Sequence, residues 1–147
     1  LRRFLIKSNR FDLDSRALLV RMHVKDLKVI SVVDDDAAVC RSTALLIESF
    51  GYRAAAFQSA ESFLSFRQRD DTSCLLLDVQ MPGMNGLELQ KQLTTEGCTV
   101  PIIFITAFHE GESCRRALEG GAVAFLTKPY GDEQLLQTIR SAITQGT

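Results

Sequence analysis

Several short, largely apolar runs in this sequence are followed directly by charged residues. Three of these runs, with the charged residue that follows each, are 29–33 with Asp34, 74–77 with Asp78, and 124–127 with Lys128. A carboxylate at the end of a buried strand is costly unless a partner stabilises its charge. Charges that close several strands therefore indicate one shared polar site.

Apolar runs alternate with helical patterns from residue 28 onward, which is typical of βαβ units and a parallel sheet. The predicted strands are 28–33, 53–57, 74–78, 102–106 and 123–127. Three of them are almost continuously apolar, as central parallel strands are. The second, R-A-A-A-F, is weaker and is predicted at an edge of the sheet.

The segments between the strands carry apolar residues at helical spacing. The predicted inner faces are Val39, Thr43, Leu46, Ile47 and Phe50 in the first helix, Leu87, Leu89 and Leu93 in the third, and Leu135, Leu136, Ile139, Ala142 and Ile143 in the last. The fourth helix is predicted at about 112–119. Asp36, Ser59 and Asp132 are predicted N-caps, and Glu61 is an acid in the first turn after Ser59.

The chain has 147 residues, which suits one domain with a single core. Residues 1–28 carry a net charge of +5 and the remainder −6. We predict that 1–27 form a basic, poorly ordered N-terminal extension, and that 28–147 form the domain. No apolar stretch approaches the ~20 residues of a membrane span.

The four cysteines form no C-x-x-C pair and have no neighbouring histidine, which argues against a zinc site. Cys40 and Cys74 lie in apolar contexts and are predicted as small core residues. The segment 1–24 lacks the unbroken apolar region of a signal peptide. We therefore predict a cytoplasmic protein without membrane contact.

Parallel strands joined by right-handed crossovers place all their carboxyl ends at one edge of the sheet, where ligands bind. The polar residues predicted to meet at this edge are Asp34, Asp35, Asp78, Thr106 and Lys128.

Four stretches resemble the receiver domains of two-component response regulators. They are V-V-D-D-D at 32–36, L-L-L-D-V-Q-M-P-G-M-N-G at 75–86, F-I-T-A at 104–107 and F-L-T-K-P at 125–129. The text of 77–90 and 120–130 is most similar to FixJ-type receivers of transcription regulators. The resemblance covers 28–145 and implies a flavodoxin-like (βα)5 fold, with a doubly wound parallel five-stranded sheet of strand order 2-1-3-4-5.

The resemblance implies that Asp78 is the phosphoacceptor. The chemistry allows this role, since a carboxylate can attack phosphorus and form an acyl phosphate. It also implies that Asp34, Asp35, Asp78 and the backbone carbonyl of Gln80 hold Mg²⁺. Hard oxygen ligands suit this ion. Without a metal, clustered carboxylates repel one another.

Three further groups are implied to bind the phosphoryl oxygens: the Lys128 ammonium, the Thr106 hydroxyl and the Ala107 backbone amide. Thr106 and Phe125 are implied to form the switch that reports phosphorylation. The Lys128–Pro129 peptide is implied to be cis, and Gly83 and Gly86 to allow backbone geometry that other residues resist.

In receivers, the side chains at two positions border the path of the attacking water, and this sequence departs from the family at both. They are Gln80, two after Asp78, and Phe108, two after Thr106. A bulky apolar Phe108 is expected to obstruct water. His23 and His109 are interpreted as surface residues.

The implied function is a phosphorylation-activated signalling module, not an enzyme with its own substrate, that assists its own phosphotransfer and dephosphorylation. The implied partners are a sensor histidine kinase, an output protein or domain at the fourth helix, fifth strand and fifth helix (112–142), and a phosphorylation-dependent homodimer. Transcription regulation follows from the FixJ likeness. The formal net charge of −1 gives no argument for direct nucleic-acid binding by this chain.

Two alternatives stay open on the residues. Asp34-x-Asp36 fits the D-x-D core of haloacid-dehalogenase-type phosphatases, but Ala38 stands where Thr or Val is expected and no cap-like insertion is present. A receiver retained only for binding is the other, and the complete Asp, Thr and Lys set argues against it.

Overall fold

The computed structural model describes residues 27–107 and 111–145, and it contains one parallel five-stranded sheet in the order β2-β1-β3-β4-β5. The strands are β1 (Val29–Val33), β2 (Arg53–Phe57), β3 (Thr72–Asp78), β4 (Ile102–Thr106) and β5 (Ala124–Thr127). The helices are α2 (Ala37–Ser49), α3 (Ala60–Leu64), α4 (Gly86–Thr95), α5 (Glu112–Glu119) and α6 (Asp132–Gln145), with a 3₁₀ turn η1 (Arg69–Asp71). The predicted fold class and strand order are confirmed.

The strand bounds follow the apolar runs closely, with one extension. β3 begins at Thr72 rather than at the predicted residue 74, because Thr72 pairs with Val29 of β1. Its hydroxyl also lies 2.7 Å from the Ser31 hydroxyl, so both buried oxygens are hydrogen-bonded. β2 is an edge strand, as its weak apolar pattern predicted.

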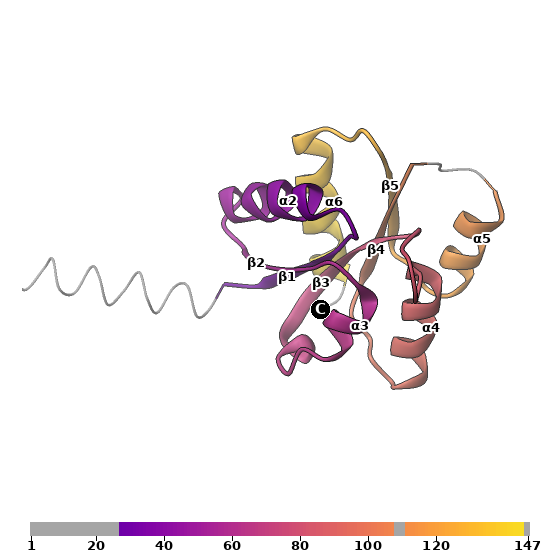
Figure 1. The fold of residues 1–147 in the computed structure, drawn as a ribbon. Helices are drawn as coiled ribbons and strands as arrows, with labels where there is room; N and C mark the ends of the chain where they lie inside the picture. Colours follow the sequence, from indigo (N-terminus) through magenta and orange to yellow (C-terminus); the bar gives the residue numbers. More distant parts are fainter. Residues whose placement is uncertain (1–26, 108–110, 146–147) are drawn as a thin grey trace, which may run out of the picture.

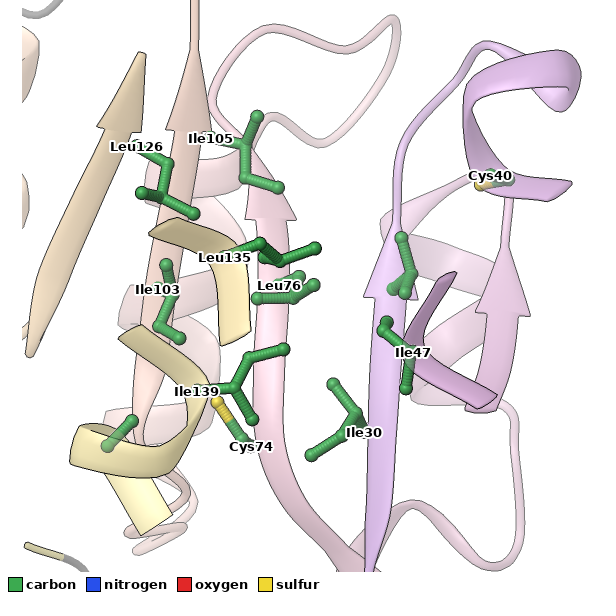
Figure 2. Close-up of a cluster of buried hydrophobic side chains, with 12 residues drawn as sticks. Ile30, Cys40, Ile47, Cys74, Leu76, Ile103, Ile105, Leu126, Leu135 and Ile139 are labelled. Atoms are coloured by element: carbon green, nitrogen blue, oxygen red, sulfur yellow. The ribbon is translucent and has the colours of Figure 1, made fainter. Parts of the chain in front are cut away.

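Helices cover both faces of the sheet (Figure 1). α2 and α6 pack on one face, where Leu135 and Ile139 of α6 lie over β3 and Ile47 of α2 lies beside Ile30 (Figure 2). α3, α4 and α5 pack on the other face around Phe63, Leu89 and further apolar side chains. Cys40 and Cys74 are buried in the first cluster, as predicted. Among the described residues, no helix is long and apolar enough to cross a membrane.

The helix starts confirm two predicted caps and correct a third. Asp36 accepts the backbone N–H groups of Ala38 and Val39, and Ser59 accepts that of Ser62. Asp132 was predicted as a cap, but it is the first residue of α6 and lies inside the first turn. A backbone bond from Leu135 N–H to the Gly131 carbonyl shows that the turn already begins at Gly131. The predicted extension over 1–27 lies outside the described residues, apart from residue 27.

Candidate functional site

Three carboxylates meet at the carboxyl edge of the sheet. Asp34 and Asp35 follow β1, Asp78 ends β3, and each offers an oxygen within 4.8 Å of the others. Asp34 is 3% exposed and Asp78 8% exposed, whereas Asp35 faces solvent. These are the three acids that the sequence predicted to converge. Their hard oxygen atoms suit a divalent cation such as Mg²⁺.

The environment of Asp78 opposes its charge. Burial, and next the negative charge of Asp34, raise the pKa of Asp78 from 3.8 to about 6. Lys128 acts in the opposite direction, and Asp35 adds a smaller upward contribution. A cation held between these acids would relieve the repulsion, so the electrostatics of the cluster fit a metal site.

Asp34 is held in place from two sides. One carboxylate oxygen accepts the backbone N–H of Asp36 at 2.9 Å, and the other accepts the Lys128 ammonium at 3.1 Å. Burial alone would lower the pKa of Lys128, but the hydrogen bond to Asp34 and the charge of Asp78 outweigh it and raise that pKa. Lys128 therefore stays a cation at this edge. Its peptide bond to Pro129 is cis, as the resemblance implied.

The remaining predicted residues lie on or directly after the neighbouring strands β4 and β5. Thr106, 7% exposed, closes β4, and its carbonyl accepts the Lys128 backbone N–H at 2.8 Å. Ala107 follows it and is exposed. Phe125 of β5 stacks on the buried Phe104 of β4, with ring centroids 5.5 Å apart and an interplanar angle of 21°.

The loop after Asp78 shows why glycines occupy two of its positions. Gly83 has φ +72°, which other residues rarely adopt. Gly86 has no positive φ, so the prediction of unusual backbone geometry was wrong there. Gly86 is instead required by space, because a Cβ would clash with the Asp78 carbonyl oxygen and approach Phe104 to 3.1 Å.

Gln80 and Phe108 are the two positions predicted to border the path of attacking water. The Gln80 side chain is exposed. Phe108 lies outside the described residues, as do His23 and His109. A further contact was missed by sequence reasoning: Glu61 was interpreted as a first-turn acid, yet it accepts the Met84 backbone N–H of the loop. No local pattern signals this contact, since the two residues are 23 apart in sequence.

A model of the response regulator receiver domain matches residues 30–140, most of the described fold. This chain belongs to the response regulator receiver domain family. Receiver domains are signalling domains of two-component systems. Domains of this family typically bind Mg²⁺ at an acidic pocket, and this chain has a cluster of three aspartates.

Named relatives support the assignment. The response regulator protein TmoT of Ectopseudomonas mendocina is 41% identical over 126 residues, covering 85% of this chain and 57% of TmoT. The transcriptional regulatory protein FixJ of Bradyrhizobium diazoefficiens is 37% identical over 116 residues, covering 79% of this chain and 57% of FixJ. Several relatives, FixJ among them, are named transcriptional regulatory proteins. This receiver spans a little over half of the length of TmoT and FixJ.

Solved structures show the same fold. The response regulator StyR matches with a TM-score of 0.75 and 39% identity over 82% of this chain and 61% of that chain. The FixJ-N structure matches with a TM-score of 0.72 and 32% identity over 79% of this chain and 93% of that chain.

Proposed function

We propose that this receiver is phosphorylated on Asp78 by a sensor histidine kinase in a Mg²⁺-dependent reaction. The observation that carries the proposal is the meeting of Asp78 with two further acids and Lys128 at one edge of the sheet. A packing role does not explain a buried carboxylate whose neighbours include two like charges.

In the proposed reaction an Asp78 oxygen attacks the phosphorus of a phosphohistidine. The new O–P bond forms as the P–N bond breaks, and the electron pair stays on the imidazole nitrogen. Catalysis of such a transfer rests on positioning and on charge stabilisation. Lys128 is the cation proposed to bind the phosphoryl oxygens, with the Thr106 hydroxyl and the Ala107 amide as further donors.

Asp34, Asp35, Asp78 and the Gln80 backbone carbonyl are the proposed ligands of the metal. When bound, Mg²⁺ supplies positive charge that offsets the charge of the acids and of the transferring group. Asp34 is proposed to act in two ways. It is a metal ligand, and its ion pair with Lys128 holds the ammonium beside Asp78.

Phosphorylation is proposed to be reported through Thr106 and Phe125 to the face formed by α5, β5 and α6. Leu118 and Val123 on this face are 55% and 37% exposed, so apolar surface is available to an output domain, an output protein or a second receiver. Regulation of transcription is proposed from the relatives named as transcriptional regulators.

The domain is proposed to span residues 28–147, with 1–27 as an extension. The protein is proposed to act in the cytoplasm, where its kinase partner phosphorylates it.

The test is incubation of the full chain with acetyl phosphate and Mg²⁺, followed by intact mass. Wild type is expected to gain one acid-labile phosphoryl group, and Asp78→Asn none. Asp70→Asn, at an exposed acid on η1, is the matched control and should label as wild type does. Labelling of the Asp78→Asn variant to the same extent would refute the site. A wild type that never labels would favour a receiver retained only for binding.

A further inference from the structure

The loop that joins β3 to α4, residues 79–85, contains the carbonyl proposed as a metal ligand. Its base is closed by two backbone bonds: Val79 N–H donates to the Ile105 carbonyl at 3.1 Å, and Gly86 N–H donates to the Val79 carbonyl at 2.9 Å. Its far end enters α4 through the capping box of Asn85 and Glu88. Gln80 lies between these fixed ends, at an exposed position.

The tip of the loop is bonded to a different helix. The Glu61 carboxylate of α3 accepts the Met84 backbone N–H at 3.0 Å. Gly83 makes room for this contact, because a Cβ there would lie 3.0 Å from the same Glu61 oxygen. The glycine thus serves both the positive φ of the loop and the approach of the carboxylate.

Glu61 is presented from a helix that is itself anchored. Its neighbours Ala60 and Phe63 are 0% and 1% exposed, and the Phe63 ring packs edge-on against Phe57 of β2 at 5.4 Å. Ser59 caps the first turn of α3. The carboxylate therefore reaches the loop from a fixed base, which lowers the entropic cost of holding the loop.

The charge state of Glu61 suits the contact. The Met84 hydrogen bond, the largest cause, lowers the pKa of Glu61, so the group stays ionised at neutral pH. An ionised acceptor makes a stronger hydrogen bond than a neutral one.

We propose that Glu61 is a positioning residue for the metal site: by fixing Met84 it restrains the 79–85 loop, which contains Gln80 and whose Gln80 backbone N–H is hydrogen-bonded to Asp78. Glu61 touches neither the metal nor the phosphoryl group in this role. The proposal rests on the proposed function of Asp78 and names a residue outside the acid cluster that supports it.

The expected effect is on Mg²⁺ affinity. Loss of one solvent-accessible hydrogen bond changes an equilibrium by about three- to tenfold. Glu61→Ala should therefore weaken Mg²⁺ binding by about that factor. At saturating Mg²⁺ the rate of phosphorylation by acetyl phosphate should return to the wild-type value, because the carbonyl is then held by the metal.

The experiment compares Glu61→Ala and Glu61→Gln with Glu48→Ala in the full chain. Glutamine keeps an acceptor oxygen without the charge, and Glu48 is an exposed acid on α2 away from the loop. Mg²⁺ affinity is measured by calorimetry, stability by urea, and the initial rate of phosphorylation as a function of Mg²⁺ concentration.

Weaker Mg²⁺ binding in Glu61→Ala, a smaller loss in Glu61→Gln and wild-type binding in Glu48→Ala, with unchanged urea stability and a rate restored by Mg²⁺, support the proposal. Equal weakening in Glu48→Ala would show a general effect of net charge and overturn it. So would wild-type affinity in Glu61→Ala, or a rate that saturating Mg²⁺ does not restore. Failure of the proposed function is separate: it appears as wild type and Asp78→Asn behaving alike towards acetyl phosphate.

Discussion

The loss of a buried side chain is expected to have opposite effects in two regions. It should lower the free energy of unfolding in the interior of the sheet and raise it at the carboxyl edge. In the interior, residues such as Leu76 and Ile139 are fully buried and apolar, and their removal leaves a cavity. At the edge, Asp78 is nearly as buried but carries a charge that its neighbours oppose. Stability is therefore concentrated in the interior, whereas the edge retains an arrangement that costs stability and that the proposed metal and phosphoryl binding would explain.

The largest expected effect lies in the interior. Ile139→Ala should lower the free energy of unfolding by about 2–5 kcal/mol, because Ile139 is 0% exposed between α6 and the sheet. Urea denaturation measures it. Leu45→Ala is the matched control, since Leu45 is 62% exposed and its truncation should cost less than about 0.5 kcal/mol. Equal losses in both variants would contradict the assigned core.

At the carboxyl edge, the loss of a charged side chain is expected to raise the free energy of unfolding. One pKa unit corresponds to about 1.4 kcal/mol, so the rise of the Asp78 pKa from 3.8 to about 6 amounts to up to ~3 kcal/mol. The folded state binds the proton more tightly than the unfolded state, so wild type loses this stability as the pH rises through that window. In chelator, Asp78→Asn should therefore be more stable than wild type above about pH 6.

The same pair of proteins gives the pH test. The advantage of Asp78→Asn should be absent near pH 3.8, grow up to about pH 6 and stay constant above it. Urea titrations across this range measure it, with Asp70→Asn as the surface control. An advantage that does not change with pH would show that the buried charge is not its cause.

A bound metal ion should offset part of the destabilisation caused by the clustered carboxylates at the carboxyl edge. Mg²⁺ at tenfold its dissociation constant should stabilise wild type by about 1.4 kcal/mol. Asp35→Ala should lose most of this gain while its metal-free stability changes little, since Asp35 is exposed. Thermal unfolding with MgCl₂, against NaCl of matched ionic strength, measures the gain. The same Mg²⁺ response in the variant would exclude Asp35 as a ligand.

The last prediction concerns the response to phosphorylation at Thr106. Thr106→Ala should still accept phosphate on Asp78, because the nucleophile and Lys128 remain. The variant should not show the change at α5, β5 and α6 that phosphorylation is expected to cause. The reason is that it lacks the hydroxyl proposed to bind a phosphoryl oxygen. NMR shift mapping of both phosphorylated proteins measures this. Full shifts in the variant would show that the coupling runs through another residue.

The elements that the sequence predicted well are those set by local patterns. The apolar runs predicted all five strands and the edge position of β2, because burial on both faces demands continuous apolar residues. The charged residues after these runs predicted the convergence of the acids and Lys128, because parallel strands share one carboxyl edge. Asp36 and Ser59 were found from their own neighbours in sequence.

The features that were missed depend on contacts between distant segments. Gln90 reads as a polar helix residue, yet it is 5% exposed and donates to the Ala117 carbonyl of α5 at 2.8 Å. Its burial follows from the close approach of the two helices, where a Cβ at Gly120 would lie 2.7 Å from the Gln90 amide oxygen. Glu61 was missed for the same reason, since its partner belongs to another element.

The backbone bonds of the sheet continue one residue into the site. Asp78 pairs with Ile105, Val79 N–H donates to the Ile105 carbonyl, and Lys128 N–H donates to the Thr106 carbonyl. The site thus inherits its dimensions from the spacing of adjacent strands, about 4.8 Å. Solvent-facing helix side chains, such as that of Leu45 on α2, can therefore change without altering the separation of the Asp78 carboxylate, the Thr106 hydroxyl and the Lys128 ammonium. The outer surface of the helices is thus free to diverge toward new partners while the backbone keeps the geometry of the site.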